Sequence, residues 1–169
     1  MTGNEAEYLT KKEITELLNS KINVRDKIII RLFYETGCTL KELVLIKIKD
    51  LDFKENKITI QAKNIKNNLV RKIIISKTLT KKLFLHTQNN SSEKRIFESR
   101  QEEQLTERRV QQIIASHSKQ IIGKKISPRD LRVTHIIHAF LDQKPIEKIE
   151  KTVGIRNIQP YIYSYFKQK

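Results

Sequence analysis

The 169-residue sequence contains a single cysteine, Cys38, and no long apolar run. One cysteine excludes an intrachain disulfide framework and a cysteine-based zinc site. The longest apolar runs, such as residues 28–30 and 73–75, are far shorter than the roughly 20 residues of a membrane-spanning helix. Residues 1–8 are polar and acidic, unlike a signal peptide. We therefore expect a protein of the reducing cytoplasm that has no membrane partner.

Acidic residues are also scarce relative to basic ones. The sequence has 19 Asp+Glu against 34 Lys+Arg, which gives a formal net charge of +15 and a pI of about 9.9. Such a balance favours a polyanionic partner, DNA or RNA, over a merely soluble, lysine-rich surface. The length suits one domain, and a hydrophobic content of 38% is enough for a real core.

Capping signals and apolar spacing predict a mainly helical α+β fold. Thr10 and Thr39 each precede a glutamate by three positions, which is typical of a capping box, and Ser127-Pro128 is typical of a helix start. Alternating and β-branched residues between 47 and 75 predict a small three-stranded antiparallel sheet. Helices are expected near residues 10–19, 23–35, 39–45, 78–86, 107–122, 127–141, 145–154 and 160–166, and strands near 47–53, 57–62 and 69–75.

The segment Ser127–Arg132, of sequence S-P-R-D-L-R, carries two arginines one helical turn apart. Arg129 and Arg132 lie along one edge of the apolar stripe of the predicted helix, where half-covered arginines can line a groove. Their planar, permanently charged forks can clamp a phosphate-like anion. The alternative is a solvated helix edge, or salt bridges to Asp130 and Glu147.

Tyrosines recur near the C-terminus, at Tyr161, Tyr163 and Tyr165. A tyrosine on a terminal helix can attack a phosphate as a nucleophile. The same residues can instead pack the last helix onto the core. The sequence pattern alone leaves both interpretations open.

Three blocks of the sequence resemble the catalytic domain of the tyrosine recombinases, the phage-type integrases. The first, residues 34–53, contains T-G-C-T-L-K-E-L and is similar to the family's Thr-Gly-x-Arg-x-x-Glu-Leu helix start and the strand behind it. The second, residues 62–75, is similar to the family's strand turn. The third, residues 127–165, is similar to its His-x-x-Arg helix, its Leu-Gly-His turn and its tyrosine helix. The resemblance covers the chain from about Thr10 to Phe166.

The resemblance implies an integrase-like domain that cleaves and rejoins DNA through a 3′-phosphotyrosyl intermediate, without a metal or cofactor. In the family, two arginines hold the scissile phosphate, a lysine on the β-turn is the general acid, and a tyrosine is the nucleophile. By position, these roles fall on Arg132, Lys63 and Tyr163. The last segment is one residue shorter than in the family, so Tyr161 and Tyr165 stay open as alternatives for the nucleophile.

The sequence departs from the family pattern at three positions of the site. Thr39 stands at the first arginine, Arg129 at the histidine of His-x-x-Arg, and Ile155 at the histidine or tryptophan after the glycine. A threonine cannot replace a bidentate cation, and loss of such a clamp commonly costs roughly 10²–10³ in rate. Thr39 reads more simply as a helix N-cap, and Arg129 is the candidate for supplying the missing charge. Two hypotheses follow: a recombinase with impaired cleavage, and a catalytically inactive DNA-binding or regulatory protein.

The resemblance also indicates where DNA would lie. The hairpin of the sheet lies against DNA in the family, which gives Lys66, Arg71 and Lys72 backbone contacts beside those of Arg129 and Arg132. A solvated hairpin is the alternative. We expect double-stranded DNA as the partner of a nucleoid-associated protein, with homo-oligomers formed on DNA or by exchange of the C-terminal helix. RNA binding is the weaker alternative, because charge alone does not separate the two nucleic acids.

The expected domain organisation is simple. Residues 1–9 are expected to be a flexible N-terminus and residues 10–169 the recombinase-like domain, without the N-terminal DNA-clamping domain usual in the family. His135 and His138 are spaced like a weak metal pair, but no third ligand cluster stands near them, so we expect no metal site.

Overall fold

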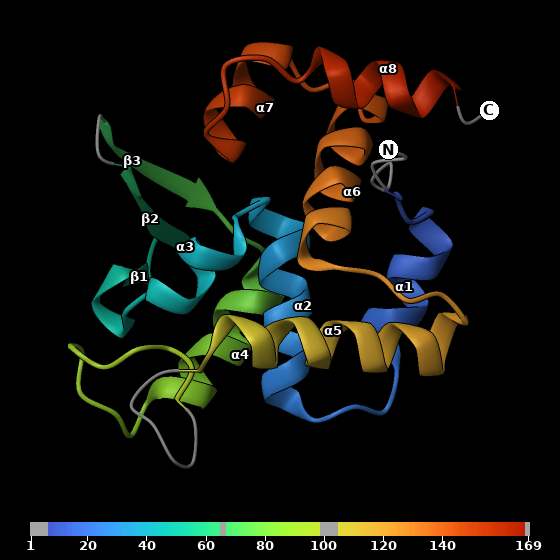
Figure 1. Ribbon diagram of the computed structural model, residues 1–169. Helices are drawn as coiled ribbons and strands as arrows, with labels where there is room; N and C mark the ends of the chain where they lie inside the picture. Colours follow the sequence, from blue (N-terminus) through green and yellow to red (C-terminus); the bar gives the residue numbers. More distant parts are fainter. Residues whose placement is uncertain (1–6, 65–66, 99–104, 168–169) are drawn as a thin grey trace.

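The computed structural model describes residues 7–64, 67–98 and 105–167, and the side chains of residues 63–69 also lie outside this description. Its elements confirm a mainly helical fold with a three-stranded antiparallel sheet (Figure 1). In chain order they are α1 (Lys11–Asn19), α2 (Val24–Thr36), α3 (Leu40–Leu45), a 3-10 turn (Ile48–Asp50), β1 (Leu51–Asp52), β2 (Lys57–Asn64), β3 (Asn67–Ile74), α4 (Lys77–Thr87), α5 (Glu107–Ile122), α6 (Pro128–Leu141), α7 (Ile146–Val153) and α8 (Gln159–Lys167).

The helices begin where their capping residues predict. The side chains of Thr10, Thr39 and Ser127 each accept a backbone N–H of the first turn, and a carboxylate three residues later completes the capping box. Gly37 and Gly154 end α2 and α7 in the left-handed conformation, which a residue with a Cβ adopts only at a cost.

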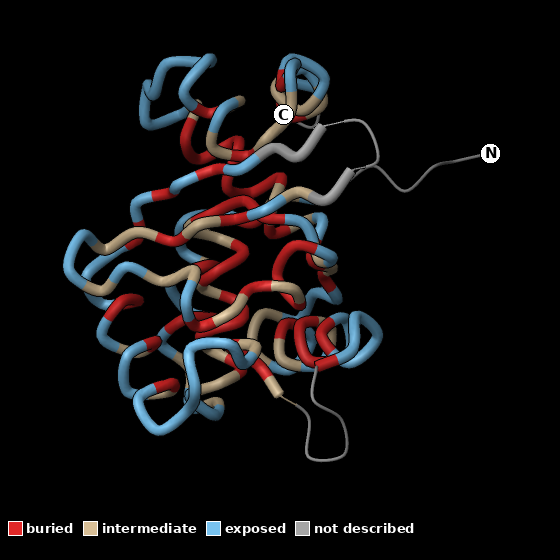
Figure 2. Tube along the Cα trace, turned by 90° about the vertical axis from the view of Figure 1, so that its left-hand side faces the viewer, coloured by how far each residue is buried: buried red, intermediate tan, exposed pale blue. Residues whose placement is uncertain are grey.

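Helix α2 forms the centre of the core. It packs against α6, α4 and α5, and its residues Ile28, Ile29 and Leu32 are fully buried. Figure 2 shows this buried interior enclosed by exposed loops and helix faces. Helices α7 and α8 pack on α6 and close one end of the molecule, with Ile149, Val153 and Ile158 buried beneath them (Figure 1).

The sheet lies to one side of this helical body, in the order β1-β2-β3 (Figure 1). Its hairpin pairs Ile60 with Arg71 and Lys63 with Asn68. The strand expected over residues 47–53 is only partly confirmed: β1 spans Leu51–Asp52, and residues 48–50 before it form a 3-10 turn. The physical reason is the Asp50 carboxylate, which accepts the N–H of Lys47 at 2.8 Å and so favours the turn.

No helix in the described part of the chain is long and apolar enough to cross a membrane. The segment before α1 is held against α6. The backbone N–H of Leu9 donates to the Thr134 hydroxyl at 2.9 Å, and the Tyr8 ring meets the Tyr165 ring edge-on at 5.0 Å. These contacts connect the beginning of the described chain to α6 and α8.

Candidate functional site

Arg132 occupies the second turn of α6, at a point where three segments meet. Its guanidinium donates to the carbonyl oxygen of Gly37, after α2, at 2.6 Å and to that of Val153, at the end of α7, at 2.9 Å. Carbonyl groups at the C-terminal ends of helices lack partners within the helix and carry partial negative charge, so a cation is well placed there. The side chain is thereby fixed in one direction.

No carboxylate among the described residues pairs with Arg132, which leaves its charge uncompensated. The side chain is partly buried, and the remaining N–H groups of its guanidinium have no acceptor in the described chain. Burial lowers the pKa of Arg132; the charge of Glu42 opposes that shift and the charge of Arg71 adds to it. Because an arginine keeps its proton under these conditions, the result is a partly desolvated cation with free donors, the arrangement that binds an anion.

The close approach of Gly37 to α6 and α7 requires a glycine. Its φ is +60°, and a Cβ would lie 2.7 Å from Val153 Cγ1 and 2.8 Å from His135 Cδ2. A larger residue would separate α2 from α6 and α7 and move the carbonyl that Arg132 binds. The glycine of the Thr-Gly motif therefore positions the guanidinium.

A second arginine, Arg71 of β3, lies beside this site but is paired. Its guanidinium makes a bidentate salt bridge with Glu42 of α3, with N–O distances of 2.8 and 2.9 Å, and its Nε donates to the carbonyl of Thr152 at 3.0 Å. Arg71 and Glu42 are only 7% and 8% exposed. The expected DNA contact of Arg71 stays a prediction, and in this structure its fork is fully engaged inside the protein.

The residues at the departures from the family pattern have structural roles. Thr39 is exposed and caps α3: its N–H donates to Glu42 at 2.8 Å, and its hydroxyl accepts the N–H of Glu42 at 3.3 Å. Ile155 packs against the buried cluster of Ile136 and Val153. Thr39 thus acts as the N-cap that the sequence predicts, and its side chain carries no charge toward the site.

The three tyrosines of α8 have different surroundings. Tyr163 is 64% exposed, and the ammonium of Lys167 lies 4.8 Å from its ring centre. Tyr165 is 5% exposed and packs against Val133 and Ile137.

Tyr161 is partly buried between two clusters, one containing Val133 and the other containing Val153. These two residues flank Arg132: one follows it in α6 and the other supplies its carbonyl acceptor. Of the three tyrosines, only Tyr161 packs against both of these clusters.

Two of the other predicted site residues are placed at the surface. Arg129 is exposed on the first turn of α6 and lines a separate hollow of about 630 Å³ that also includes Gln112 of α5 and Lys125. The structure gives it no acceptor in common with Arg132. Lys72 is exposed on the face of β3 opposite Arg71, because successive strand residues point to opposite faces.

Two further predicted site residues, Lys63 and Lys66, belong to the sequence at the end of β2 and just after it. Lys63 lies close to the end of β2, paired with Asn68, and the side chain of Lys63 is outside the described part of the structure. Lys66 lies outside the described residues altogether.

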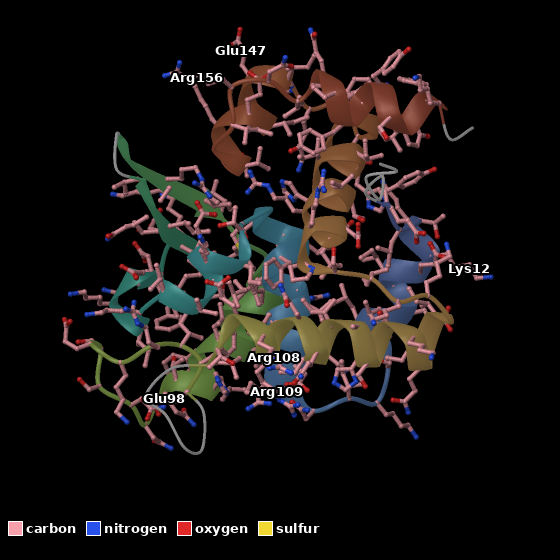
Figure 3. All side chains as sticks on the ribbon, in the orientation of Figure 1. Lys12, Glu98, Arg108, Arg109, Glu147 and Arg156 are labelled. Atoms are coloured by element: carbon pink, nitrogen blue, oxygen red, sulfur yellow. The ribbon has the colours of Figure 1, made fainter. Side chains whose placement is uncertain are left out.

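In the described part of the chain, Arg108, Arg109 and Arg156 do not form one group with Arg132. Figure 3 shows Arg156 at the outer edge of the end formed by α7 and α8, whereas Arg108 and Arg109 project from α5 at the opposite end. Arg95 donates to the carbonyl of Leu45 and so is partly engaged. Arg156 on the one side and Arg108 and Arg109 on the other therefore do not belong to a single basic patch.

The two histidines of α6 are buried and serve the helix packing. His135 Nδ1 lies 2.7 Å from the carbonyl oxygen of Tyr34, and His138 Nδ1 lies 3.0 Å from the Tyr34 hydroxyl. Because a carbonyl only accepts, Nδ1 of His135 carries a proton. Within the described ranges, no three His, Cys, Asp or Glu side chains are grouped so as to hold a metal ion. Burial raises the pKa of the Cys38 thiol to about 12, so it is an inert core residue.

Sequence reasoning missed the buried pair of Glu42 and Arg71. A signal for it exists, because Arg71 shares strand parity with Ile73 and Ile75, which are buried. Glu42 likewise lies among apolar residues in the short helix α3. Two opposite charges on buried faces predict a pair, although sequence alone does not say that they meet.

Comparisons with known proteins identify the family and the fold of the chain. The model of the phage integrase family matches residues 7–168. Tyrosine recombinase XerA of Pyrococcus horikoshii is 27% identical over 160 residues, which cover 90% of this chain and 55% of the relative. Tyrosine recombinase XerC of Vibrio cholerae is 30% identical over 152 residues, covering 86% of this chain and 47% of the relative. The chain thus spans about half the length of the curated relatives it matches.

Solved structures show the same fold. The crystal structure of XerA recombinase superposes with a TM-score of 0.81 at 20% identity, covering 95% of this chain and 64% of that one. XerH site-specific recombinase, solved bound to a palindromic difH substrate, gives a TM-score of 0.73 at 17% identity and covers 95% of this chain and 50% of that one. The chain therefore belongs to the phage integrase family, and its fold is that of a tyrosine recombinase catalytic domain.

Proposed function

We propose that this chain binds double-stranded DNA in recombination or integration and holds a backbone phosphate at Arg132. The observation that carries the proposal is the uncompensated guanidinium of Arg132, which is fixed by the carbonyls of Gly37 and Val153 and has free donors. The net charge of +15 supplies the long-range attraction to a polyanion. Relatives solved with DNA, including the XerH complex, support DNA as the partner.

Further basic residues complete the proposed interface. Lys72 is exposed on β3, and Lys66 lies in the sequence between β2 and β3, so both are proposed to contact the DNA backbone. Arg129 extends the interface from the first turn of α6. Phosphate contacts of this kind position a protein on a duplex without reading its sequence.

A binding competition tests DNA against the RNA alternative. A fluorescein-labelled DNA duplex would be titrated with the protein and displaced by unlabelled DNA duplex or by an RNA duplex of the same sequence. We expect the DNA duplex to compete at least about tenfold better, because the two helices differ in groove shape. Equal competition would favour RNA binding or nonspecific charge attraction, and absence of binding would sink the proposal.

A second candidate activity is cleavage and rejoining of DNA through a phosphotyrosyl intermediate. It is favoured by the position of Tyr161 beside Arg132 on the helix that also carries Tyr163. In this step a tyrosine oxygen loses its proton to solvent and bonds to the phosphorus, the bond from the phosphorus to the 5′ oxygen breaks, and the leaving 5′ oxygen takes a proton from Lys63 as general acid. Attack by Tyr163 further requires α8 to turn, because this side chain now points into solvent.

A nicked DNA duplex that traps covalent intermediates tests the cleavage candidate. The protein would be incubated with this DNA beside Tyr163→Phe and Tyr161→Phe variants, and adducts would be resolved on denaturing gels. An adduct that one variant loses identifies the nucleophile. If the protein binds DNA and forms no adduct, the result favours the hypothesis of a catalytically inactive DNA-binding protein.

A further inference from the structure

The buried pair of Arg71 and Glu42 lies directly beside the site of Arg132. The Glu42 carboxylate accepts hydrogen bonds from Nη1 and Nη2 of Arg71, at 2.8 and 2.9 Å. It also accepts one from the backbone N–H of Thr39 at 2.8 Å. Arg71 and Arg132 bind consecutive carbonyls at the end of α7, those of Thr152 and Val153. The guanidinium groups of Arg71 and Arg132 therefore bind neighbouring residues of the backbone. A single carboxylate, that of Glu42 on α3, is paired with one of them.

The structure assigns Arg71 as a positioning residue that holds the charge of Glu42 away from Arg132, and this assignment rests on the proposed function. A buried carboxylate that lost its partner would be strongly unfavourable, so it would recruit the nearest cation. Arg132 is available for this, because it binds the carbonyl next to the one that Arg71 binds, and it is the other arginine whose charge acts on Glu42. A salt bridge from Arg132 to Glu42 would neutralise the guanidinium that is proposed to hold phosphate.

Packing around Gly154 fixes Arg71 in this role. A Cβ added to Gly154 would lie 2.5 Å from Arg71 Nη1 and 2.9 Å from its Cζ, so the guanidinium fills the space that the glycine leaves. Its Nε hydrogen bond to Thr152 aligns the fork with the Glu42 carboxylate. The Arg71 side chain is thus enclosed by the backbone at Gly154 on one side and hydrogen-bonded to Glu42 on the other. Its role does not require a donor that is exposed to solvent.

The charge balance explains why the pair matters in this chain. Thr39 stands at the position of the family's first arginine and carries no charge. Of the described side chains that bind the end of α7, Arg71 and Arg132 are the cations. With Glu42 paired to Arg71, the formal charges of these two residues cancel, and the positive charge of Arg132 remains to attract the ligand. With Arg71 removed and Glu42 kept, the sum would fall to zero and an anion would gain no net attraction.

Charge-matched variants distinguish positioning from direct DNA contact. DNA affinity would be measured by fluorescence anisotropy with a labelled duplex for the wild type, Arg71→Gln, Glu42→Gln and the double variant Arg71→Gln with Glu42→Gln. We expect Arg71→Gln to weaken binding about tenfold or more, and the double variant to recover to within about threefold of the wild type, because it removes the carboxylate that captures Arg132. Glu42→Gln alone should bind at least as tightly as the wild type.

Two outcomes overturn the assignment. A folded double variant that binds as weakly as Arg71→Gln would mean that Arg71 contacts DNA itself, and unchanged binding by folded Arg71→Gln would mean that Glu42 does not capture Arg132. If Arg71→Gln fails to fold, as judged by circular dichroism, the double variant alone decides by its affinity relative to the wild type. The apolar double variant Arg71→Met with Glu42→Leu is a second way to remove both charges. Replacing both members of a buried pair is often neutral for stability. Failure of the wild type to bind DNA would instead count against the proposed function.

Discussion

Arg132 donates a hydrogen bond of 2.9 Å to the carbonyl oxygen of Val153, which ties the second turn of α6 to the last residue of α7. A second bond of 2.6 Å to Gly37 ties the same guanidinium to the end of α2. The residue proposed to hold phosphate is therefore also a connector of three helices. Its role in stability can be separated from its role in binding.

Replacing Arg132 by methionine should destabilise the fold. The variant keeps an unbranched apolar stem but leaves the two carbonyls without their donor, and hydrogen bonds to charged groups contribute roughly 1.5–3 kcal/mol. We expect the free energy of unfolding, measured in urea, to fall by about 2 kcal/mol. The matched control is Arg129→Met on the exposed first turn, which should change it by no more than about 0.5 kcal/mol. Equal effects at both positions would show that the Arg132 bonds contribute little.

Replacing Gly154 by alanine should cost more than replacing Gly123. Both glycines have a left-handed φ, of +73° and +72°, so both variants carry the same backbone strain of roughly 1–2 kcal/mol. A Cβ at Gly123 meets nothing within 4 Å, whereas at Gly154 it would lie 2.5 Å from Arg71 Nη1. The excess loss of Gly154→Ala over Gly123→Ala in urea unfolding therefore measures the displacement of Arg71. Equal losses would mean that the guanidinium moves aside without cost.

Acid should destabilise the protein through His135. Burial lowers the pKa of His135 to about 4, below its ordinary value of 6.5. Between these values the unfolded chain binds the proton and the folded one does not, so this contribution is complete above pH 6.5 and is lost as the pH falls toward 4. The expected loss between pH 7 and pH 5 is about 2 kcal/mol.

The variant His135→Asn tests this assignment, since its amide can still donate to the Tyr34 carbonyl but does not titrate. Urea unfolding at pH 7 and pH 5 should show a smaller difference for the variant than for the wild type. Burial also lowers the pKa of His138, so part of the acid sensitivity should persist. A variant with an unchanged pH dependence would show that His135 does not titrate as the structure indicates.

The tyrosines of α8 should differ sharply in their contribution to stability. Tyr165 is 5% exposed and packs against the Tyr8 ring, so Tyr165→Ala should lower the free energy of unfolding by about 3 kcal/mol. Tyr163 is 64% exposed, and Tyr163→Ala should change it by less than about 0.5 kcal/mol. Thermal unfolding of the two variants makes the comparison. A large loss for Tyr163→Ala would mean that its ring is buried in solution and that α8 has another orientation.

Local signals were sufficient to predict most of the fold. Capping boxes at Thr10 and Thr39, the Ser127-Pro128 start of α6 and the left-handed glycines depend on neighbouring residues, so they can be read from the sequence. The strand expected at 47–53 was too long, because the Asp50 carboxylate accepts a backbone N–H and favours a turn over residues 48–50, which leaves Leu51–Asp52 as β1.

The site was less predictable, because its contacts join distant segments. The resemblance pointed to Arg132, but not to the carbonyls of Gly37 and Val153 that hold it. Arg71 was expected at the DNA, while its strand parity with buried residues indicates an inward direction that the pairing with Glu42 realises. Contacts of this kind depend on how β3, α3 and α7 meet, which the spacing of residues within one element does not contain.

The salt dependence of DNA binding determines whether Arg132 holds a backbone phosphate. Affinity for a labelled duplex would be measured over a range of salt concentrations for the wild type, Arg132→Gln and Lys12→Gln, a control that removes the same charge from an exposed position on α1 (Figure 3). We expect Arg132→Gln to bind about tenfold more weakly and its slope of log affinity against log salt to be smaller by about one, while Lys12→Gln changes neither appreciably. If folded Arg132→Gln kept the affinity and slope of the Lys12→Gln control, the claim would be contradicted.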